Sequence, residues 1–472
     1  MQVMLFFPEL MLIITIGVLF LLSLSNQSKA ILKVVAYGGS LLSIIAVLIS
    51  FKQQGVLFYG VYKIDLFSQV FKLILTSGLW LIVCLGKDLK GIEEEFHSEY
   101  YFFLWTSVLG LVMLTSSVEL LTILLCLELS SFALYIIIPF RKRGQYREQM
   151  EAGIKYILFG ASATAITLYG MSYIFGLTHS TFLKDLSVTF PSMIQNENLI
   201  LIGLILMLGG FFYKLALFPM HFWAPDVYEG ASNETTAFIA TLPKVAAVAL
   251  IIRFLSLCSI STAQITTILA TFAILSMTIG NLSALVQQDI KRLLAYSSIA
   301  HAGYVLIGLF CMAEGMSAGI YYITGYLLMN IACFYVVYHI GTAEKNVTID
   351  DLNGLYKRSP LLAFTLAIGA FGLAGIPPTI GFTGKLLIFT AAIQKGFYGL
   401  VVIAVINAGI SAFYYLRLVR AAYFGVEQTL IPFRLSFSTR CIALLIIFGI
   451  LLTGIFPQVM VETMNRAIQM IM

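Results

Sequence analysis

Long apolar runs separated by short polar connections make up almost the whole chain. The runs are about 20 residues long, which is the length of helix that crosses a hydrocarbon core of about 30 Å. The pattern therefore predicts an all-α, polytopic membrane protein. Counting the runs predicts about fourteen transmembrane helices, near residues 3–24, 31–51, 66–86, 100–117, 119–139, 152–176, 198–222, 234–257, 262–285, 293–312, 316–341, 361–389, 394–421 and 439–462.

The composition agrees with this class. The 472 residues are 60% hydrophobic and 11% charged, whereas soluble domains carry about 25% charged residues. Residues 3–24 begin without a basic region, so we interpret them as the first helix and not as a cleavable signal peptide. The net charge of +5 does not indicate nucleic acid as a partner, because the positive residues lie mostly in short connections where membrane lipid is the neighbour.

The Lys and Arg residues are distributed unevenly between the two sides. Connections on one side hold most of them, including Arg141, Lys291 and Arg292, while the opposite connections hold few, including Lys63 and Arg253. By the positive-inside rule the first side is cytoplasmic. We therefore expect both termini on the non-cytoplasmic side of the cell inner membrane.

Three lysines stand inside apolar stretches beside helix-breaking prolines. Lys214 is followed by Pro219 about one turn later, Lys244 follows Pro243, and Lys385 follows the pair Pro377-Pro378. A charged ammonium at the middle of a bilayer costs about 2.5–3.5 kcal/mol even on the lenient insertion scale. Three buried lysines at three helix breaks predict a path for charge transfer.

Two more ionisable residues belong to the same candidate site. Glu128 lies among apolar residues, and Lys214 is its expected ion-pair partner, either as a static pair or as a proton-holding switch. Lys244 and Lys385 either extend to the membrane surface or face a polar interior. His301 is either a satisfied core residue or a relay between these two lysines.

Other charged residues near the helices receive simpler interpretations. Lys155 is expected to pair with Glu151 one turn earlier. Glu9, near the start of the first helix, is explained by the helix dipole. No partner is predicted for Lys72.

No redox cofactor site is expected in this chain. The cysteines contain no CxxC pair and are interpreted as small packing residues: Cys84, Cys126, Cys258, Cys311, Cys333 and Cys441. No dinucleotide fingerprint follows a strand. If the protein serves a redox enzyme, the electrons travel in other subunits.

Two portions of the chain look alike in plan. The fourth to eighth predicted helices contain one interrupted span with Lys214, and the ninth to thirteenth contain another with Lys385. Matching interrupted segments indicate an inverted repeat with its site at the bilayer midplane.

Several segments together resemble the antiporter-like subunit N of respiratory complex I, over roughly residues 100–420. They are Leu127-Glu-Leu-Ser130, Ile154-Lys-Tyr156, Pro225-Asp-Val-Tyr-Glu-Gly230, Leu242-Pro-Lys244, Lys291-Arg-Leu-Leu-Ala-Tyr-Ser-Ser-Ile-Ala-His-Ala-Gly-Tyr304 and Gly375-Ile-Pro-Pro-Thr-Ile-Gly-Phe-Thr-Gly-Lys385. The segment from Lys291 is shared with subunits L and M and with cation/proton antiporters. One stretch, Ala231-Ser-Asn-Glu-Thr-Thr236, departs from the proline-containing stretch that is common in the family.

The resemblance implies a division of the chain and a role for each site residue. It implies an N-terminal three-helix segment (1–98), two inverted five-helix repeats with broken helices (99–258 and 259–421) and a C-terminal helix (422–472). Glu128 would modulate Lys214, Lys214 and Lys244 would hold and pass protons, His301 would bridge, and Lys385 would exchange with the far side.

The implied function is proton translocation in NADH:quinone oxidoreductase, coupled to redox chemistry in partner subunits. M-type and K/J-type membrane subunits are the expected neighbours, and other partners would carry FMN, iron–sulfur clusters and quinone. The alternatives are a subunit of a multi-subunit cation/proton antiporter or membrane-bound hydrogenase, and a purely structural scaffold.

Overall fold

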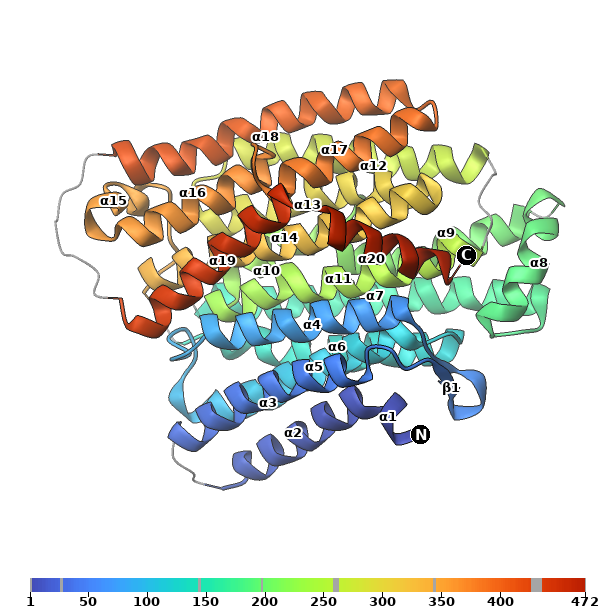
Figure 1. Ribbon diagram of the computed structural model, residues 1–472, viewed down its shortest axis with the longest axis horizontal. Helices are drawn as coiled ribbons and strands as arrows, with labels where there is room; N and C mark the ends of the chain where they lie inside the picture. The colour runs from blue at the N-terminus through green and yellow to red at the C-terminus, as the bar shows by residue number, and fades with distance from the viewer. Residues whose placement is uncertain are drawn as a thin grey trace.

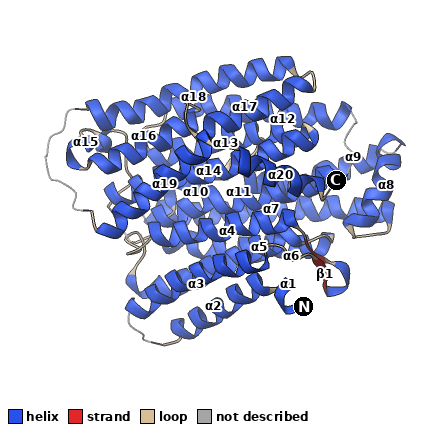
Figure 2. Ribbon diagram, in the orientation of Figure 1, coloured by secondary structure: helices blue, strands red, loops and turns tan. Residues whose placement is uncertain are grey.

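The computed structural model describes residues 2–25, 29–142, 146–196, 198–257, 263–342, 345–425 and 435–471. Helices that run along one common direction form almost all of it (Figure 1). In the described part, the one sheet is an antiparallel hairpin of β1 (Gly55–Leu57) and β2 (Tyr62–Ile64), in which Val56 pairs with Lys63 (Figure 2). The predicted all-α membrane class is therefore confirmed.

The helices of the N-terminal half are α1 (Gln2–Leu5), α2 (Phe7–Ser23), α3 (Lys29–Ser50), α4 (Leu66–Leu85), α5 (His97–Ser116), α6 (Leu120–Ile137), α7 (Tyr146–Thr178), α8 (Leu183–Asn196), α9 (Asn198–Leu215), α10 (Trp223–Gly230) and α11 (Asn233–Leu257). The remaining helices are α12 (Ala263–Leu285), α13 (Ile290–Phe310), α14 (Met312–Ile340), α15 (Leu355–Arg358), α16 (Pro360–Ala374), α17 (Ile380–Gln394), α18 (Tyr398–Phe424), α19 (Phe437–Ile455) and α20 (Gln458–Gln469). The helices α8, α10 and α15, most of α20, and the β hairpin were not predicted from the sequence.

Ten helices in the described ranges are long and apolar enough to cross a membrane. The shorter apolar helices are α2, α9, α16 and α17. The spans within α11, α13 and α14 are 100%, 94% and 89% buried, whereas those within α3, α7, α12, α18 and α19 are at most 39% buried. The first three are thus the protein interior, and the more exposed helices present their apolar side chains outward, as expected for lipid contact.

Two of the three predicted helix breaks are present. Helix α9 ends at Leu215, and α16 and α17 are separate helices with Pro377-Pro378 between them. The third prediction is wrong, because α11 continues through Pro243. A proline inside a helix removes one backbone hydrogen bond. Helix α11 tolerates this loss because its span is completely buried among other helices and not exposed to lipid.

The two ends of the bundle differ in their polar contacts. One end, called the lysine-rich end here, carries the exposed ion pairs Lys29–Glu94 and Lys33–Asp88, the latter at 2.7 Å. The opposite end, called the hairpin end, carries β1 and β2, and both the N- and C-terminal regions lie toward it (Figure 1). Equal placement of the two termini agrees with an even number of crossings.

Two residues predicted to be in connections are buried inside helices. Lys291 lies in the first turn of α13 and donates to the Ala231 carbonyl at 2.8 Å. Arg253 lies in α11, pairs with Asp65 at 3.0 Å and donates to the Thr115 carbonyl. Burial alone would raise the pKa of the Asp65 carboxyl, but the Arg253 guanidinium, the Ser68 amide and Lys63 together hold that pKa below its usual value. Lys291 was misplaced because helix ends cannot be located closely from hydropathy, whereas Arg253 lies within the predicted helix 234–257 and was assigned to a connection because of its charge.

Glycine allows α16 and α17, the two halves of the helix interrupted near residue 375, to pack closely. A Cβ atom added at Gly381 would overlap the Gly372 carbonyl oxygen, which is backbone and cannot move aside. By contrast, a Cβ atom added at Gly17 in α2 would meet nothing within 4 Å.

We therefore predict that Gly381→Ala destabilises the protein by about 1–3 kcal/mol or more, as overpacking does. The thermal midpoint of the purified assembly measures this. Gly17→Ala is the matched control and should leave the midpoint unchanged or slightly raised, because Ala favours helix. Equal midpoints for the two variants would contradict the proposed close packing.

Candidate functional site

Glu128 and Lys214 face the same small cavity without touching. Lys214, in the last turn of α9, is 4% exposed and its Nζ has no hydrogen-bond partner. Glu128, on α6, accepts a hydrogen bond from Thr164 of α7 at 2.5 Å. Both residues line a cavity of about 20 Å³, which is enough space for a water molecule. In the described part of the chain no direct ion pair joins them, so the predicted contact is replaced by a pair of opposite charges across a cavity.

Lys244 lies at the interrupted end of α9. Lys244 is 1% exposed. Its Nζ donates to the Leu215 carbonyl at 3.0 Å and to Ser298 Oγ at 2.8 Å. Leu215 is the last residue of α9, where carbonyl oxygens lose their helical partners. A cation at this end also interacts favourably with the helix dipole. Lys244 therefore caps a broken helix inside the protein and does not extend to the membrane surface.

Lys385 repeats this arrangement in the second portion of the chain. It projects from α17, is 5% exposed, and donates to the carbonyls of Leu373 at 3.0 Å and Ala374 at 2.9 Å. These two residues end α16, and Gly375 follows in the left-handed region with φ of 86°. The prediction that Lys385 faces the interior is consistent with this geometry, and extension to the surface is not observed.

His301 lies between the two capping lysines within a group of tyrosines. On α13, it is 2% exposed, with Nδ1 2.6 Å from Tyr322 Oη and Nε2 3.0 Å from Tyr415 Oη. Lys244 Nζ is 5.9 Å from the ring centre of Tyr326, whose own ring centre is 5.3 Å from that of His301.

A similar aromatic contact reaches the other lysine. Lys385 Nζ is 5.0 Å from the ring centre of Tyr304, whose centre is 6.0 Å from that of His301. The sequence reasoning missed these tyrosines. Tyr322 and Tyr326 are four residues apart and share one face of α14, which is the signal that was available.

Charged residues at the lysine-rich end connect three helices. Lys155 of α7 pairs with Glu151 at 2.7 Å, as predicted, and also with Asp226 of α10. Arg292 of α13 pairs with Asp226 at 2.8 Å and Glu229 at 2.6 Å. The segment Pro225–Gly230 is thus a structural junction, and its acidic residues are partly exposed.

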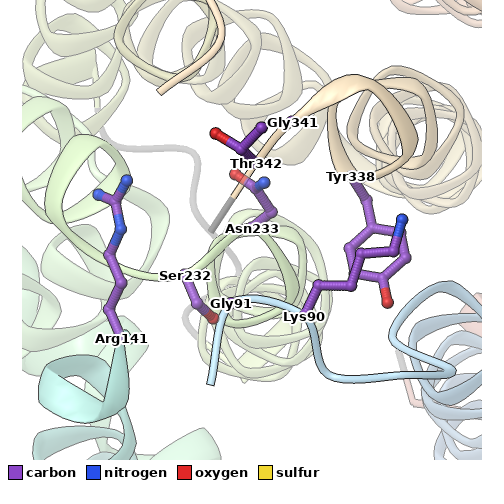
Figure 3. A pocket seen from close by; sticks show the side chains of 8 residues that line it. All are labelled: Lys90, Gly91, Arg141, Ser232, Asn233, Tyr338, Gly341 and Thr342. Carbon is purple, nitrogen blue, oxygen red and sulfur yellow. The ribbon is translucent and has the colours of Figure 1, made fainter. Parts of the chain in front are cut away.

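A second polar cavity lies at this end, beside a buried carboxylate that was not predicted as a site residue. Arg141 lies on one side of it and Lys90 with Tyr338 on the other (Figure 3). The cavity, about 10 Å³, adjoins Gly91, whose amide donates to Glu234 Oε1 at 3.0 Å. Glu234 is fully buried and its Oε2 has no partner. It belongs to the stretch that departs from the family pattern.

Glu9 lies in the first turn of α2, as the helix-dipole interpretation requires, but that interpretation missed its charged partner. Glu9 and Lys72 form an ion pair in which both side chains are fully buried.

The cysteines are mostly buried: Cys84, Cys126, Cys311 and Cys333 are buried and Cys441 is exposed, while Cys258 lies outside the described residues. Among the residues described, no group of three His, Cys, Asp or Glu side chains is arranged to hold a metal ion.

Interrupted helices capped by buried lysines, inside a bundle of membrane-spanning length, define a membrane protein of the antiporter-like class. The chain belongs to the family of NADH:quinone oxidoreductase/Mrp antiporter membrane subunits, whose pattern matches residues 117–411.

Relatives and a solved structure agree over nearly the full length. The chain is 47% identical to the NADH-quinone oxidoreductase subunit N 2 of Solidesulfovibrio magneticus over 419 residues, which are 89% of this chain and 88% of the relative. It is 42% identical to the subunit N 2 of Opitutus terrae over 466 residues, with 98% and 97% covered. A chain of respiratory complex I from Thermus thermophilus superposes with a TM-score of 0.84 at 32% identity, covering 96% of this chain and 98% of that one.

The contacts of His301 predict the effect of removing one tyrosine hydroxyl. Tyr322→Phe leaves Nδ1 without its partner in a fully buried setting, which costs about 1–3 kcal/mol. We expect a lower thermal midpoint and slower proton movement in the assembled enzyme. Tyr398→Phe, at a position that is 65% exposed, is the control and should change neither quantity. Unchanged proton movement in Tyr322→Phe would exclude this hydroxyl from the path.

Proposed function

We propose that this chain moves protons across the membrane arm of an NADH:quinone oxidoreductase through Glu128, Lys214, Lys244, His301 and Lys385. The observation that carries the proposal is the pair of lysine caps. Lys244 and Lys385 each hold carbonyl oxygens at the end of an interrupted, buried helix. Two buried cations in equivalent settings, with a titratable imidazole between them, are what a proton path requires.

The caps couple proton occupancy to backbone structure. A protonated lysine donates to the exposed carbonyls, whereas loss of its charge weakens the interaction with the carbonyls and with the helix dipole. Each protonation change therefore alters the stability of the helix end beside it. A movement of the helix end, driven by partner subunits, would in the same way change the proton affinity of the lysine.

The contacts between neighbouring groups support an order for the proposed path. Glu128 lies across the cavity from Lys214, and Lys214 is adjacent in sequence to Leu215, whose carbonyl Lys244 binds. From Lys244 the contacts continue through Ser298 and the tyrosines to His301 and then to Lys385. Attraction from the Glu128 carboxylate across a small cavity lowers the cost of the unpartnered Lys214 ammonium.

The division of the chain is part of the proposal. The matching lysine caps support two inverted five-helix repeats at 99–258 and 259–421, preceded by the segment 1–98 and followed by 422–472. The lysine-rich end would face the cytoplasm and both termini the opposite side of the inner membrane. M-type and K/J-type membrane subunits would be the neighbours, and FMN, iron–sulfur clusters and quinone would lie in other subunits.

The experiment replaces the capping lysines in the assembled enzyme in membrane vesicles. Lys244→Met and Lys385→Met remove the ammonium, so we expect NADH-driven proton movement to fall by about tenfold or more, equivalent to at least about 1.4 kcal/mol in barrier height. Vesicle acidification reports proton movement, and native gels report assembly.

Arginine at the same positions tests whether a fixed charge is sufficient. The guanidinium stays charged at all relevant pH values, so Lys244→Arg keeps the cation but cannot release its proton. We expect it to move protons as poorly as Lys244→Met. Full proton movement in either assembled variant would refute the proposed role of Lys244.

A further inference from the structure

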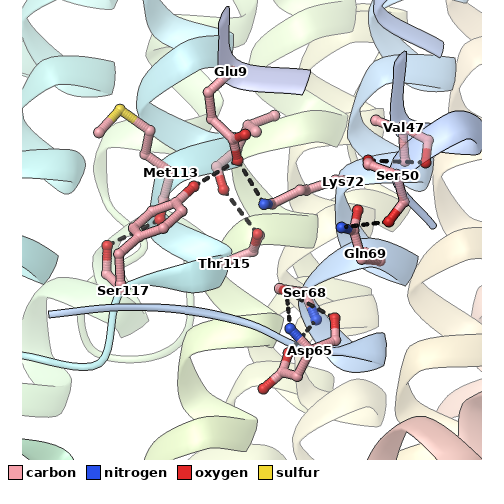
Figure 4. Close-up of polar contacts among 12 residues, drawn as sticks. Glu9, Val47, Ser50, Asp65, Ser68, Gln69, Lys72, Met113, Thr115 and Ser117 are labelled. Carbon is pink, nitrogen blue, oxygen red and sulfur yellow. Dashed lines mark hydrogen bonds and ion pairs between the residues drawn. The ribbon is translucent and has the colours of Figure 1, made fainter. Parts of the chain in front are cut away.

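A second buried acid–base group lies in the N-terminal segment, outside both repeats. Lys72 of α4 and Glu9 of α2 form an ion pair at 2.5 Å (Figure 4). Tyr62 of β2 donates to the same Glu9 Oε1 at 2.6 Å. Glu9 and Lys72 are both 0% exposed, and Tyr62 is 1% exposed. No contact of this group was foreseen from the sequence, in which the two charges are 63 residues apart.

The polar atoms of this group are not fully satisfied. Glu9 Oε2 has no hydrogen-bond partner, and Lys72 Nζ has none besides its ion pair with Glu9, although an ammonium can donate three. A buried pair that serves stability alone needs further hydrogen bonds to offset the loss of hydration. The free carboxylate oxygen is instead an open position for a proton.

The group lies between the level of the relay and the hairpin end. Lys72 precedes Gly78 by six residues, or about 9 Å along α4. A Cβ atom added at Gly78 would be 3.1 Å from Leu242, which is two residues before Lys244. The pair is therefore displaced from the level of Lys244 toward the end of the bundle where the hairpin lies.

Polar contacts connect this region to a cavity at the hairpin end. Tyr62 forms a β-bridge with Ser117, and the nearby Thr115 carbonyl accepts from Arg253. Arg253, paired with Asp65, lines a cavity of about 550 Å³ together with Lys63. A cavity of this size has room for many water molecules, and its lining includes Arg253 and Lys63, the residue that follows Tyr62 in β2.

We propose that Glu9, Lys72 and Tyr62 form an additional proton-holding site that exchanges protons with solvent through the cavity at the hairpin end. A proton binds Glu9 Oε2 and converts the carboxylate to a carboxylic acid, while Lys72 stays protonated and Tyr62 keeps its hydrogen bond to Oε1. Release of the same proton restores the ion pair. The inference rests on the proposed function, because it assigns the site to proton translocation.

The test compares single and double neutralisation in the intact complex. Glu9→Gln and Lys72→Met each leave one buried charge unpaired and are expected to assemble poorly. The double variant Glu9→Gln with Lys72→Met leaves no unpaired charge and should assemble. Because a positioned acid or base accelerates proton transfer greatly, we expect its ratio of protons moved to NADH oxidised to fall by at least about twofold.

Tyr62→Phe provides an independent variant that keeps the ion pair intact. Loss of the hydroxyl removes one hydrogen bond to the Glu9 carboxylate and should lower the same ratio without loss of assembly. The matched control is Lys33→Met with Asp88→Asn, which neutralises an exposed pair in the same segment. Exposed pairs contribute little, so the control should behave as the unaltered protein.

The outcomes separate this inference from the proposed function. A normal ratio in the assembled double variant, or in Tyr62→Phe where the double variant does not assemble, makes the pair a static structural contact and overturns the inference. When Lys244→Met is measured alongside, its loss of proton movement keeps the proposed function in place. Normal proton movement in Lys244→Met would instead overturn the proposed function itself.

Discussion

The arrangement of this protein depends on lysine ammonium groups that bind carbonyl oxygens at the ends of interrupted helices. Inside a bilayer a helix cannot end without exposing backbone acceptors that no water satisfies, and a lysine cannot be buried without a partner for its charge. The same hydrogen bonds meet both requirements. Lys244 donates to the Leu215 carbonyl, and Lys385 donates to the carbonyls of Leu373 and Ala374. The lysine supplies hydrogen-bond donors to the carbonyls at the helix break, and these carbonyls supply acceptors for the buried ammonium.

This mutual dependence explains why the central helices are the most buried. Helix α11 carries Lys244 and has Pro243 in its interior, so it has both an unusual charge and a missing hydrogen bond. Complete burial of its span keeps these polar defects away from lipid. His301 on α13 and its tyrosine partners lie in the same interior.

The sequence predicted the membrane class, two of the three helix breaks and the interior position of the lysines, because each follows from local hydropathy and proline chemistry. It did not predict which atoms the lysines bind. The acceptors of Lys244 belong to residues 29 and 54 positions away, and no local pattern encodes such contacts. The ion pair of Glu9 was missed for the same reason, since its partner Lys72 lies on another helix. The count of fourteen crossings stays a prediction.

The two buried Glu–Lys pairs differ in whether the opposite charges are in contact. Glu128 and Lys214 remain apart across a cavity, so their Coulomb attraction is weaker. Glu9 and Lys72 are in contact at 2.5 Å, so their Coulomb attraction is stronger. A proton enters such a pair only at the free oxygen Oε2. In the proposed scheme the first pair is part of the proton path, and the second binds a proton at the oxygen that its ion pair leaves free.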